Sequence, residues 1–300
     1  MTALAKQSNT IYPKRKQIIK EHHLDIFGLY FDKNSKDTSE QFQITISKSG
    51  FVIVNQDYEF TQEQYNSIRT LLRTYKCLAL YNGDKILDYE NGVRDLPEYV
   101  NKVYLNLESW ENIDMNSFPP WIIGLYLHIN MNEDCMGSNV LTFPIELKYL
   151  TIINYDVGII DDLKITAFSP KLETLIMYGI IDPKLFQILP SSIKHIIIET
   201  DEMLEVEDNE DYEPNFNIAI EFQNYFGNGR LPFGIETIIY NRQRPIIENH
   251  IIDRYNDIDF TLIPSSVKYI SINAHILMPH IQYRQLLLKL HQTHPGAILE

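Results

Sequence analysis

The sequence predicts an α/β repeat fold: a solenoid with a parallel β-sheet of short strands, an irregular or short-helical convex side, and a cap at each end. The main observation is a pattern that occurs seven times, in which a Pro or Ser is followed by apolar residues three, six and eight positions later. These anchors lie 21 to 42 residues apart and are Pro97, Pro119, Pro144, Ser169, Pro190, Pro232 and Pro264. Most of the spacings fit stacked units of about 20 to 29 residues, and the two longest indicate insertions.

Each unit is predicted to contain a turn followed by one short strand. Proline fixes φ and lacks an N–H donor, so it suits the turn before a strand rather than the strand interior. The residues six and eight positions after the anchor alternate with polar or aromatic neighbours, which is the period of a half-buried strand. If the strands stack in parallel, positions six and eight point inward, whereas positions five, seven and nine form the opposite side, here called the outer face. One interior row is then expected to contain Leu105, Leu127, Ile152, Met177 and Ile198.

The chain divides into three predicted parts: an N-terminal arm and cap over 1–70, the solenoid over 71–275, and a capping helix over 276–300. Two insertions are predicted within the solenoid, at 199–229 and 241–260. The caps are needed because a stack of strands has two open ends with unpaired backbone groups.

The first cap is predicted to consist of a hairpin, with strands at 42–46 and 51–54, followed by a helix over 62–73. Thr61 and Gln64 form the capping box of that helix. The helix leads into a degenerate repeat with Leu78 and Leu80 at the strand positions, which makes eight units.

Two further helices are predicted, within 215–226 and over 279–292. The acidic run at 199–213 contains no Lys or Arg and is predicted to be a solvated loop. Weak Ca²⁺ binding is its less favoured alternative, because the run lacks the glycine and ligand spacing of an EF-hand.

Composition excludes several classes of protein. The formal charge of -14 argues against general affinity for nucleic acid or for an anionic membrane. No apolar stretch reaches 18 residues, and the first 20 residues lack the hydrophobic region of a secretory signal. Cys77 and Cys135 are the only cysteines, which excludes a disulfide framework and favours a reducing compartment. We expect a cytoplasmic protein, or one of the host cytoplasm or virion if the gene is viral.

The phrases that begin two of the strands resemble a known repeat family. Leu189-Pro190-Ser191-Ser192-Ile193 and Ile263-Pro264-Ser265-Ser266-Val267 are similar to the Leu-Pro-x-Ser-Leu phrase of FNIP repeats. These are leucine-rich-repeat relatives found in social amoebae and in large DNA viruses of amoebae. The resemblance extends at the level of spacing over about 71–273 and implies a leucine-rich-repeat-like solenoid. The Phe-Asn pair that names the family is missing from most units, so the chain resembles a divergent member.

The outer face is predicted to be exposed, apolar and aromatic. Tyrosine combines a large contact area with a polar tip and is enriched in interaction hot spots, so a protein partner is expected there. The candidate partner-binding residues are Tyr81, Tyr104, Tyr126, His128, Tyr149, Ile176, Tyr178, Ile197 and Tyr269. The alternative is that the protein's own insertions or arms cover these residues, or that they reflect a high usage of Tyr and Ile.

No catalytic, cofactor-binding or metal-binding residues are predicted. His291 and His294 lie three residues apart, but no third or fourth metal ligand is identifiable. Gly227-Asn228-Gly229 precedes a strand, whereas a phosphate-binding loop follows a strand and opens a helix. We therefore expect a non-enzymatic interaction scaffold without a cofactor. The alternative is a structural component of a larger assembly, such as a virus particle, in which the same face packs against other copies or proteins.

Overall fold

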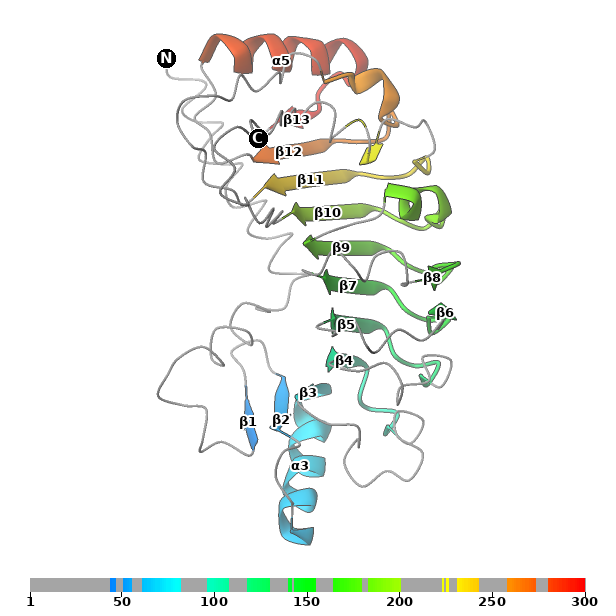
Figure 1. Ribbon diagram of the computed structural model, residues 1–300, viewed down its shortest axis with the longest axis vertical. Helices are drawn as coiled ribbons and strands as arrows, with labels where there is room; N and C mark the ends of the chain where they lie inside the picture. The colour runs from blue at the N-terminus through cyan, green and yellow to red at the C-terminus, as the bar shows by residue number, and fades with distance from the viewer. Residues whose placement is uncertain are drawn as a thin grey trace, which may run out of the picture.

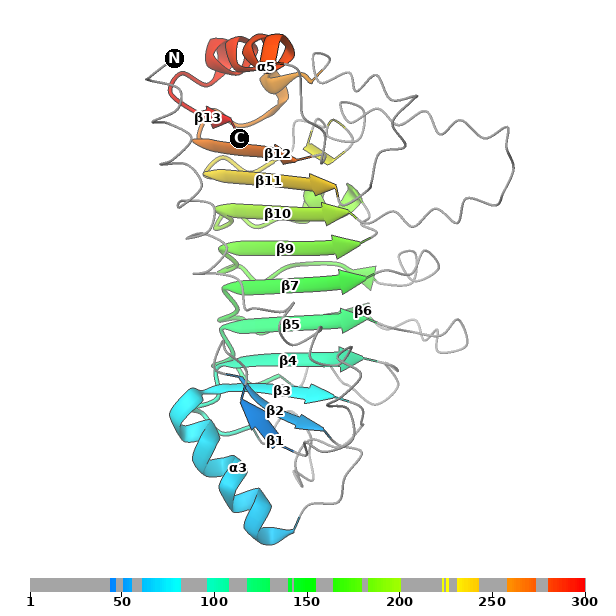
Figure 2. The ribbon, with the colours of Figure 1, turned by 90° about the vertical axis from the view of Figure 1, so that its left-hand side faces the viewer.

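The computed structural model describes a large part of the 300-residue chain. The described residues are 44–46, 51–55, 61–81, 96–107, 118–129, 140–141, 143–154, 164–179, 183–200, 223, 225–226, 231–242, 258–273 and 280–299. Within them the dominant feature is one sheet whose strands lie side by side along the long axis of the molecule (Figure 1, Figure 2).

This sheet has eleven strands among the described residues, and neighbouring strands in the sheet follow the order of the chain. All neighbours pair in parallel except the first two, which form an antiparallel pair. The strands are β1 (Ile44–Ile46), β2 (Val52–Asn55), β3 (Cys77–Tyr81), β4 (Lys102–Leu107), β5 (Gly124–Ile129), β7 (Tyr149–Asn154), β9 (Thr174–Gly179), β10 (His195–Thr200), β11 (Thr237–Arg242), β12 (Tyr269–Asn273) and β13 (Ile298–Leu299). The molecule is thus a parallel β-solenoid with little helix, and the prediction of a repeat solenoid is confirmed at that level.

The anchor residues occupy the predicted turn before each strand. In six of the seven units the N–H three positions after the anchor donates to the anchor's carbonyl, as Val100 does to Pro97 (2.8 Å) and Leu172 to Ser169 (3.1 Å). The carbonyl at position four then accepts the N–H groups of positions four and five of the next unit. Lys148, for example, accepts from Glu173 (2.9 Å) and Thr174 (3.0 Å). Repetition of this bifurcated bond fixes the register of each strand on its neighbour.

The predicted interior row exists. Leu105 lies opposite Leu127, and the row continues strand by strand through Ile152, Met177 and Ile198. All five are buried in one hydrophobic cluster, here called the interior core. The repeat pattern therefore identified both the strands and the side of the sheet that packs inward.

The irregular side of the solenoid contains short elements. These are the 3₁₀ helices η4 (Pro183–Ile188) and η6 (Phe260–Leu262), and a small second sheet formed by β6 (Val140–Leu141) and β8 (Lys164–Ile165). Phe186, Phe260 and Ile165 from these elements belong to the interior core. The sequence predicted turns and irregular structure here but did not locate β6 or β8.

The first end of the sheet carries the predicted hairpin and helix (Figure 1). Helix α3 (Gln62–Tyr75) begins at the Thr61–Gln64 capping box and ends at Lys76, which adopts a left-handed conformation with φ of 61°. Its Ile68 and Leu72 are buried in the interior core. The helix is two residues longer than predicted.

At the other end, α5 (His280–Thr293) lies over the last strands (Figure 1). Its Leu286 and Leu290 are buried in the interior core. Residues 298–299, for which no strand was predicted, form β13 and pair in parallel with β12. Of the helix predicted within 215–226, residues 223 and 225–226 are described and helical, and the remainder lies outside the described residues.

Candidate partner-binding face

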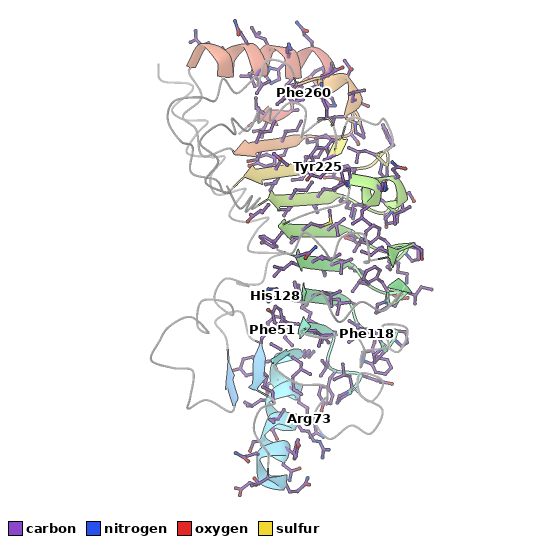
Figure 3. The ribbon with its side chains drawn as sticks, viewed as in Figure 1. Phe51, Arg73, Phe118, His128, Tyr225 and Phe260 are labelled. Carbon is purple, nitrogen blue, oxygen red and sulfur yellow. The ribbon has the colours of Figure 1, made fainter. Side chains whose placement is uncertain are left out.

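The outer face consists of side chains at positions five, seven and nine, aligned across the strands by the same register. Tyr104 lies opposite Tyr126, and the row continues through Thr151, Ile176 and Ile197. Apolar side chains of the face, among them Tyr104, Ile176 and Ile197, form a second hydrophobic cluster, separate from the interior core. Figure 3 places Phe51 and His128 on one side of the strands and Phe118 on the other.

Contrary to the prediction, this face is not exposed. Tyr104 and Ile197 are 0% exposed, and Tyr126 is 1% exposed. Ile176, Tyr178, Tyr269 and His128 are also buried, and Tyr149 is half-buried. Tyr81 lies in β3, but its side chain is outside the described part of the chain. The prediction of an exposed strand face is therefore wrong for the residues whose burial is described, and the alternative that the chain itself covers them fits the burial.

One end of the outer face is a packed aromatic group around Gly124. The ring of Phe51 meets that of Tyr126 edge-on, with centroids 5.9 Å apart and an interplanar angle of 88°. A Cβ on Gly124 would lie 3.0 Å from Cγ of Lys102 and 3.4 Å from Cε2 of Tyr126. The absence of a side chain at Gly124 thus leaves the space over which the Tyr126 ring lies.

Burial dominates the electrostatics of this aromatic group. It raises the pKa of the Tyr126 phenol far above its ordinary value, with smaller contributions from Cys77 and Tyr149. Burial also raises the pKa of the Cys77 thiol, and the positive charge of Lys102 offsets part of that shift. The Nζ of Lys102 lies 5.8 Å from the centroid of the Tyr149 ring, a cation–π distance. The group therefore presents neutral Tyr and Cys side chains with one cation beside them.

Polar atoms also face outward from the strands. The Oη of Tyr104 lies 3.4 Å from Nδ1 of His128 on the next strand. The hydroxyls of Thr151, Thr174 and Ser271 are buried and have no hydrogen-bond partner within the described part of the chain. A buried hydroxyl without a hydrogen-bond partner costs about 1 to 3 kcal/mol. A layer of polypeptide over the face would therefore lower this cost if it placed polar groups beside these three hydroxyls.

Two features of the sheet were not predicted from the sequence. Phe51 was predicted only as part of a hairpin, yet β2 extends the sheet and brings this ring into the outer-face cluster.

The second feature is a ladder of alternating charge at position four. Its members are Lys148, Glu173, Lys194, Glu236 and Lys268, with N–O distances of 3.9, 3.3 and 3.4 Å for the pairs 148–173, 194–173 and 268–236. Aligning the repeats by position four would have revealed the ladder.

The two C-terminal histidines serve the packing of the cap. Nε2 of His294 donates to the carbonyls of Ile263 (3.2 Å) and Pro264 (3.0 Å), and its Nδ1 lies 2.8 Å from Oγ1 of Thr293. Nε2 of His291 lies 3.0 Å from the carbonyl of Ala297. Across the described residues, no cluster of three or more His, Cys, Asp or Glu side chains is arranged to hold a metal ion.

No helix in the described part of the chain combines the length and apolar character needed to cross a bilayer. Comparison with known proteins yields no matching family model, no matching curated protein and no matching solved structure.

Proposed function

We propose that this protein is a non-enzymatic recognition scaffold that binds a protein partner through the outer face of its sheet. The observation that carries the proposal is the second apolar surface, distinct from the interior core, that runs in register across the strands. A sheet needs one apolar face to fold against its core. The second one is suited to burial against another stretch of polypeptide.

The chemistry of the face favours a peptide-like partner over a small polar ligand. Its members are aromatic and aliphatic, so they gain more free energy from burial against the apolar side chains of a polypeptide than against a small polar ligand. The hydroxyls of Thr151, Thr174 and Ser271 can bond to backbone amides of a chain that lies across the strands. A partner that uses this face must displace whatever buries it now.

We also propose that the solenoid is a divergent leucine-rich-repeat-like protein related to FNIP repeats. Support comes from the phrases at Leu189–Ile193 and Ile263–Val267, in which the N–H of the last residue donates to the carbonyl of Pro190 or Pro264. The 3₁₀ helices η4 and η6 on the irregular side also fit such repeats, which combine a strand with a helix or 3₁₀ segment.

Affinity capture with the tagged chain, followed by mass spectrometry, tests the recognition role. The Tyr104→Ala plus Tyr126→Ala variant removes two rings from the outer face. Ile145→Ala plus Phe233→Ala is the matched control, because these apolar side chains are 57% and 76% exposed at turns away from that face. We expect a partner that the wild type and the control retain and that the double Tyr variant loses.

Far-UV circular dichroism verifies that each variant is folded, and Tyr178→Ala replaces the double variant if that one is not. A partner lost equally from the control, or retained by all variants, would place the binding surface elsewhere. Light scattering tests the structural alternative: a stable self-assembly that the Tyr substitutions abolish favours a role in a larger assembly.

A further inference from the structure

The amino ends of strands β4 to β12 lie along one edge of the solenoid (Figure 2). The residues one and two positions after each anchor form the tight turn at this edge. Neighbouring turns are hydrogen-bonded: Oγ of Ser169 donates to the carbonyl of Ile145 (2.9 Å), and the N–H of Gly234 donates to Oγ of Ser266 (3.1 Å). Positions one, two and four therefore form rows with one member per strand, and these three rows are here called the turn edge.

The turn edge exposes apolar side chains. Among the described residues four large apolar side chains are exposed, and two of them lie at position one of this edge, Ile145 at 57% and Phe233 at 76%. The other position-one residues from β5 to β12 are also exposed, and they are small or apolar: Pro120, Pro170, Ser191 and Ser265. Single exposed apolar residues are common on proteins, so the order of the residues in the rows has to identify what binds here.

The order of charges at position four is self-complementary. From β7 to β12 the row reads Lys148, Glu173, Lys194, Glu236 and Lys268. A two-fold axis normal to the sheet between β9 and β10 brings a second copy against the turn edge, with each row facing the same row in reverse order. Glu173 then lies opposite Lys194 of the second copy, and Lys148 lies opposite its Glu236. An axis through β9 or β10 would instead pair like charges.

The same axis also matches the turn residues by size. At position two the units of β5, β7 and β9 have large side chains, whereas those of β10, β11 and β12 have small ones. The axis places Trp121, Glu146 and Lys171 opposite Ser266, Gly234 and Ser192 of the second copy, respectively. At position one it places Phe233 opposite Ile145. Any axis between two strands pairs unlike charges, but the axis between β9 and β10 is the one that brings these two exposed apolar side chains together.

We propose that the partner of the turn edge is a second copy of this chain, which forms a symmetric dimer about this axis. Exposed ion pairs add little affinity, whereas like charges in contact are costly, so the charge ladder sets the register and the contact between Phe233 and Ile145 supplies most of the affinity. Six units form a strip about 24 Å long. A strip this narrow buries less area than a typical stable interface, so the dimer dissociates on dilution.

The dimer does not depend on the proposed recognition role. The axis is normal to the sheet, so the outer faces of the two copies lie side by side on the same side of the dimer. A partner that binds one outer face thus has a second one next to it, a consequence that rests on the proposed function.

Sedimentation equilibrium of the full chain over a concentration series tests the dimer. Phe233→Ser is expected to raise the dissociation constant about tenfold, because it removes an exposed ring from both symmetric contacts. Leu288→Ser is the matched control, since Leu288 is 65% exposed on α5, away from the turn edge, and the dissociation constant is expected to stay unchanged. Circular dichroism verifies that each variant is folded, and Phe233→Ala replaces Phe233→Ser if that one is not.

A charge swap separates contacts between copies from contacts within one chain. Lys148→Glu is expected to raise the dissociation constant severalfold, because symmetry places two pairs of like charge across the interface. Adding Glu236→Lys is expected to restore the affinity. Within each chain the double variant leaves like charges side by side in the ladder, so a purely structural role of these residues predicts a further loss instead.

Cross-linking reports the register. In a background of Cys77→Ala and Cys135→Ser, a short bismaleimide is expected to join two copies of the Ser191→Cys variant, whose turns lie about one strand spacing, or 4.8 Å, apart along the long axis. Glu98→Cys is the control, because its exposed turn lies about 34 Å along that axis from its counterpart, seven strand spacings away.

Four results would overturn the proposal: a wild type that is monomeric up to about 0.5 mM, equal effects of Phe233→Ser and Leu288→Ser, a charge swap that does not restore association, or cross-linking through Glu98→Cys. The outcome is separable from that of the capture experiment. Tyr104→Ala plus Tyr126→Ala is expected to leave the dimer intact, and Ile145→Ala plus Phe233→Ala is expected to be monomeric and still to retain a partner of the outer face.

Discussion

His294 is expected to hold the C-terminal cap onto the last repeat, and His294→Ala tests this directly. The side chain is 3% exposed, and its Nε2 is the donor to the carbonyls of Ile263 and Pro264 in the turn before β12. The carbonyl of Pro264 also accepts the N–H of Val267, so the alanine variant leaves the Ile263 carbonyl with the larger loss.

The magnitude follows from two contributions. Loss of a buried hydrogen bond with an unsatisfied partner costs about 1 to 3 kcal/mol. Removal of a buried ring leaves a space whose lining loses van der Waals contacts, which adds about 1 kcal/mol. We therefore expect the free energy of unfolding to fall by about 2 to 4 kcal/mol.

His291→Ala is the matched control, because it removes the same ring from the same helix. His291 is exposed, and its Nε2 bonds to the carbonyl of Ala297, so a loss of about 1 kcal/mol or less is expected. Urea unfolding of both variants measures the difference. Hydrogen exchange localises it, since end units of a repeat array open separately from the middle. Amides of β12 are expected to exchange faster in His294→Ala, and those of β7 are not.

Equal losses in the two variants, or an unchanged exchange rate in β12, would refute the assignment of His294 as the residue that joins cap and repeat.

Three further predictions concern the sheet itself. Gly124→Val is expected to lower stability by about 1 to 3 kcal/mol in urea unfolding, because the new side chain meets Lys102 and Tyr126; Lys102→Ala in the same background is expected to recover part of the loss. Lys194→Glu places three carboxylates in succession with Glu173 and Glu236, so a loss of about 1 kcal/mol is expected that shrinks in 1 M NaCl; a salt-independent loss would contradict it. Burial raises the pKa of the Cys77 thiol above its ordinary value, so its alkylation rate is expected to rise at a higher pH than that of a free cysteine measured alongside; coincident pH profiles would contradict this.

The strands and their register could be predicted because the information lies within each unit. An anchor and the three apolar residues after it span nine residues, and the turn bond from Val100 to Pro97 or from Val267 to Pro264 depends on local sequence alone. Pairing between units then follows from repetition of the same geometry. The two-residue strands β6, β8 and β13 are too short to show a period, so no pattern could locate them.

The burial of the outer face was not predicted. The alternation of apolar and polar residues along a strand indicates which side points into the core, but it does not indicate whether the other side is also covered. A signal was nevertheless present. Strands buried on both faces of a parallel sheet contain near-continuous apolar runs, and Ile196-Ile197-Ile198 and Ile238-Ile239-Tyr240 are such runs. Taken with the 44% hydrophobic content, these runs indicate a layer on each side of the central strands.

The two halves of the outer face differ in the free energy that is lost when the layer over them is removed. Toward β3–β5 the face is aromatic and carries polar tips, with Tyr104 and His128 in contact and the Lys102 cation above the Tyr149 ring. Toward β9–β11 it is mainly aliphatic, with Ile197 and Ile239 fully buried, and Tyr178 of β9 is its one aromatic member in the cluster. Exposing Ile to water forfeits about 1.5 to 3 kcal/mol per side chain, whereas Tyr keeps a hydrated hydroxyl when its ring is uncovered. Uncovering the face therefore costs less free energy over β3–β5, so under the proposed recognition role a partner is expected to compete first at this end of the sheet.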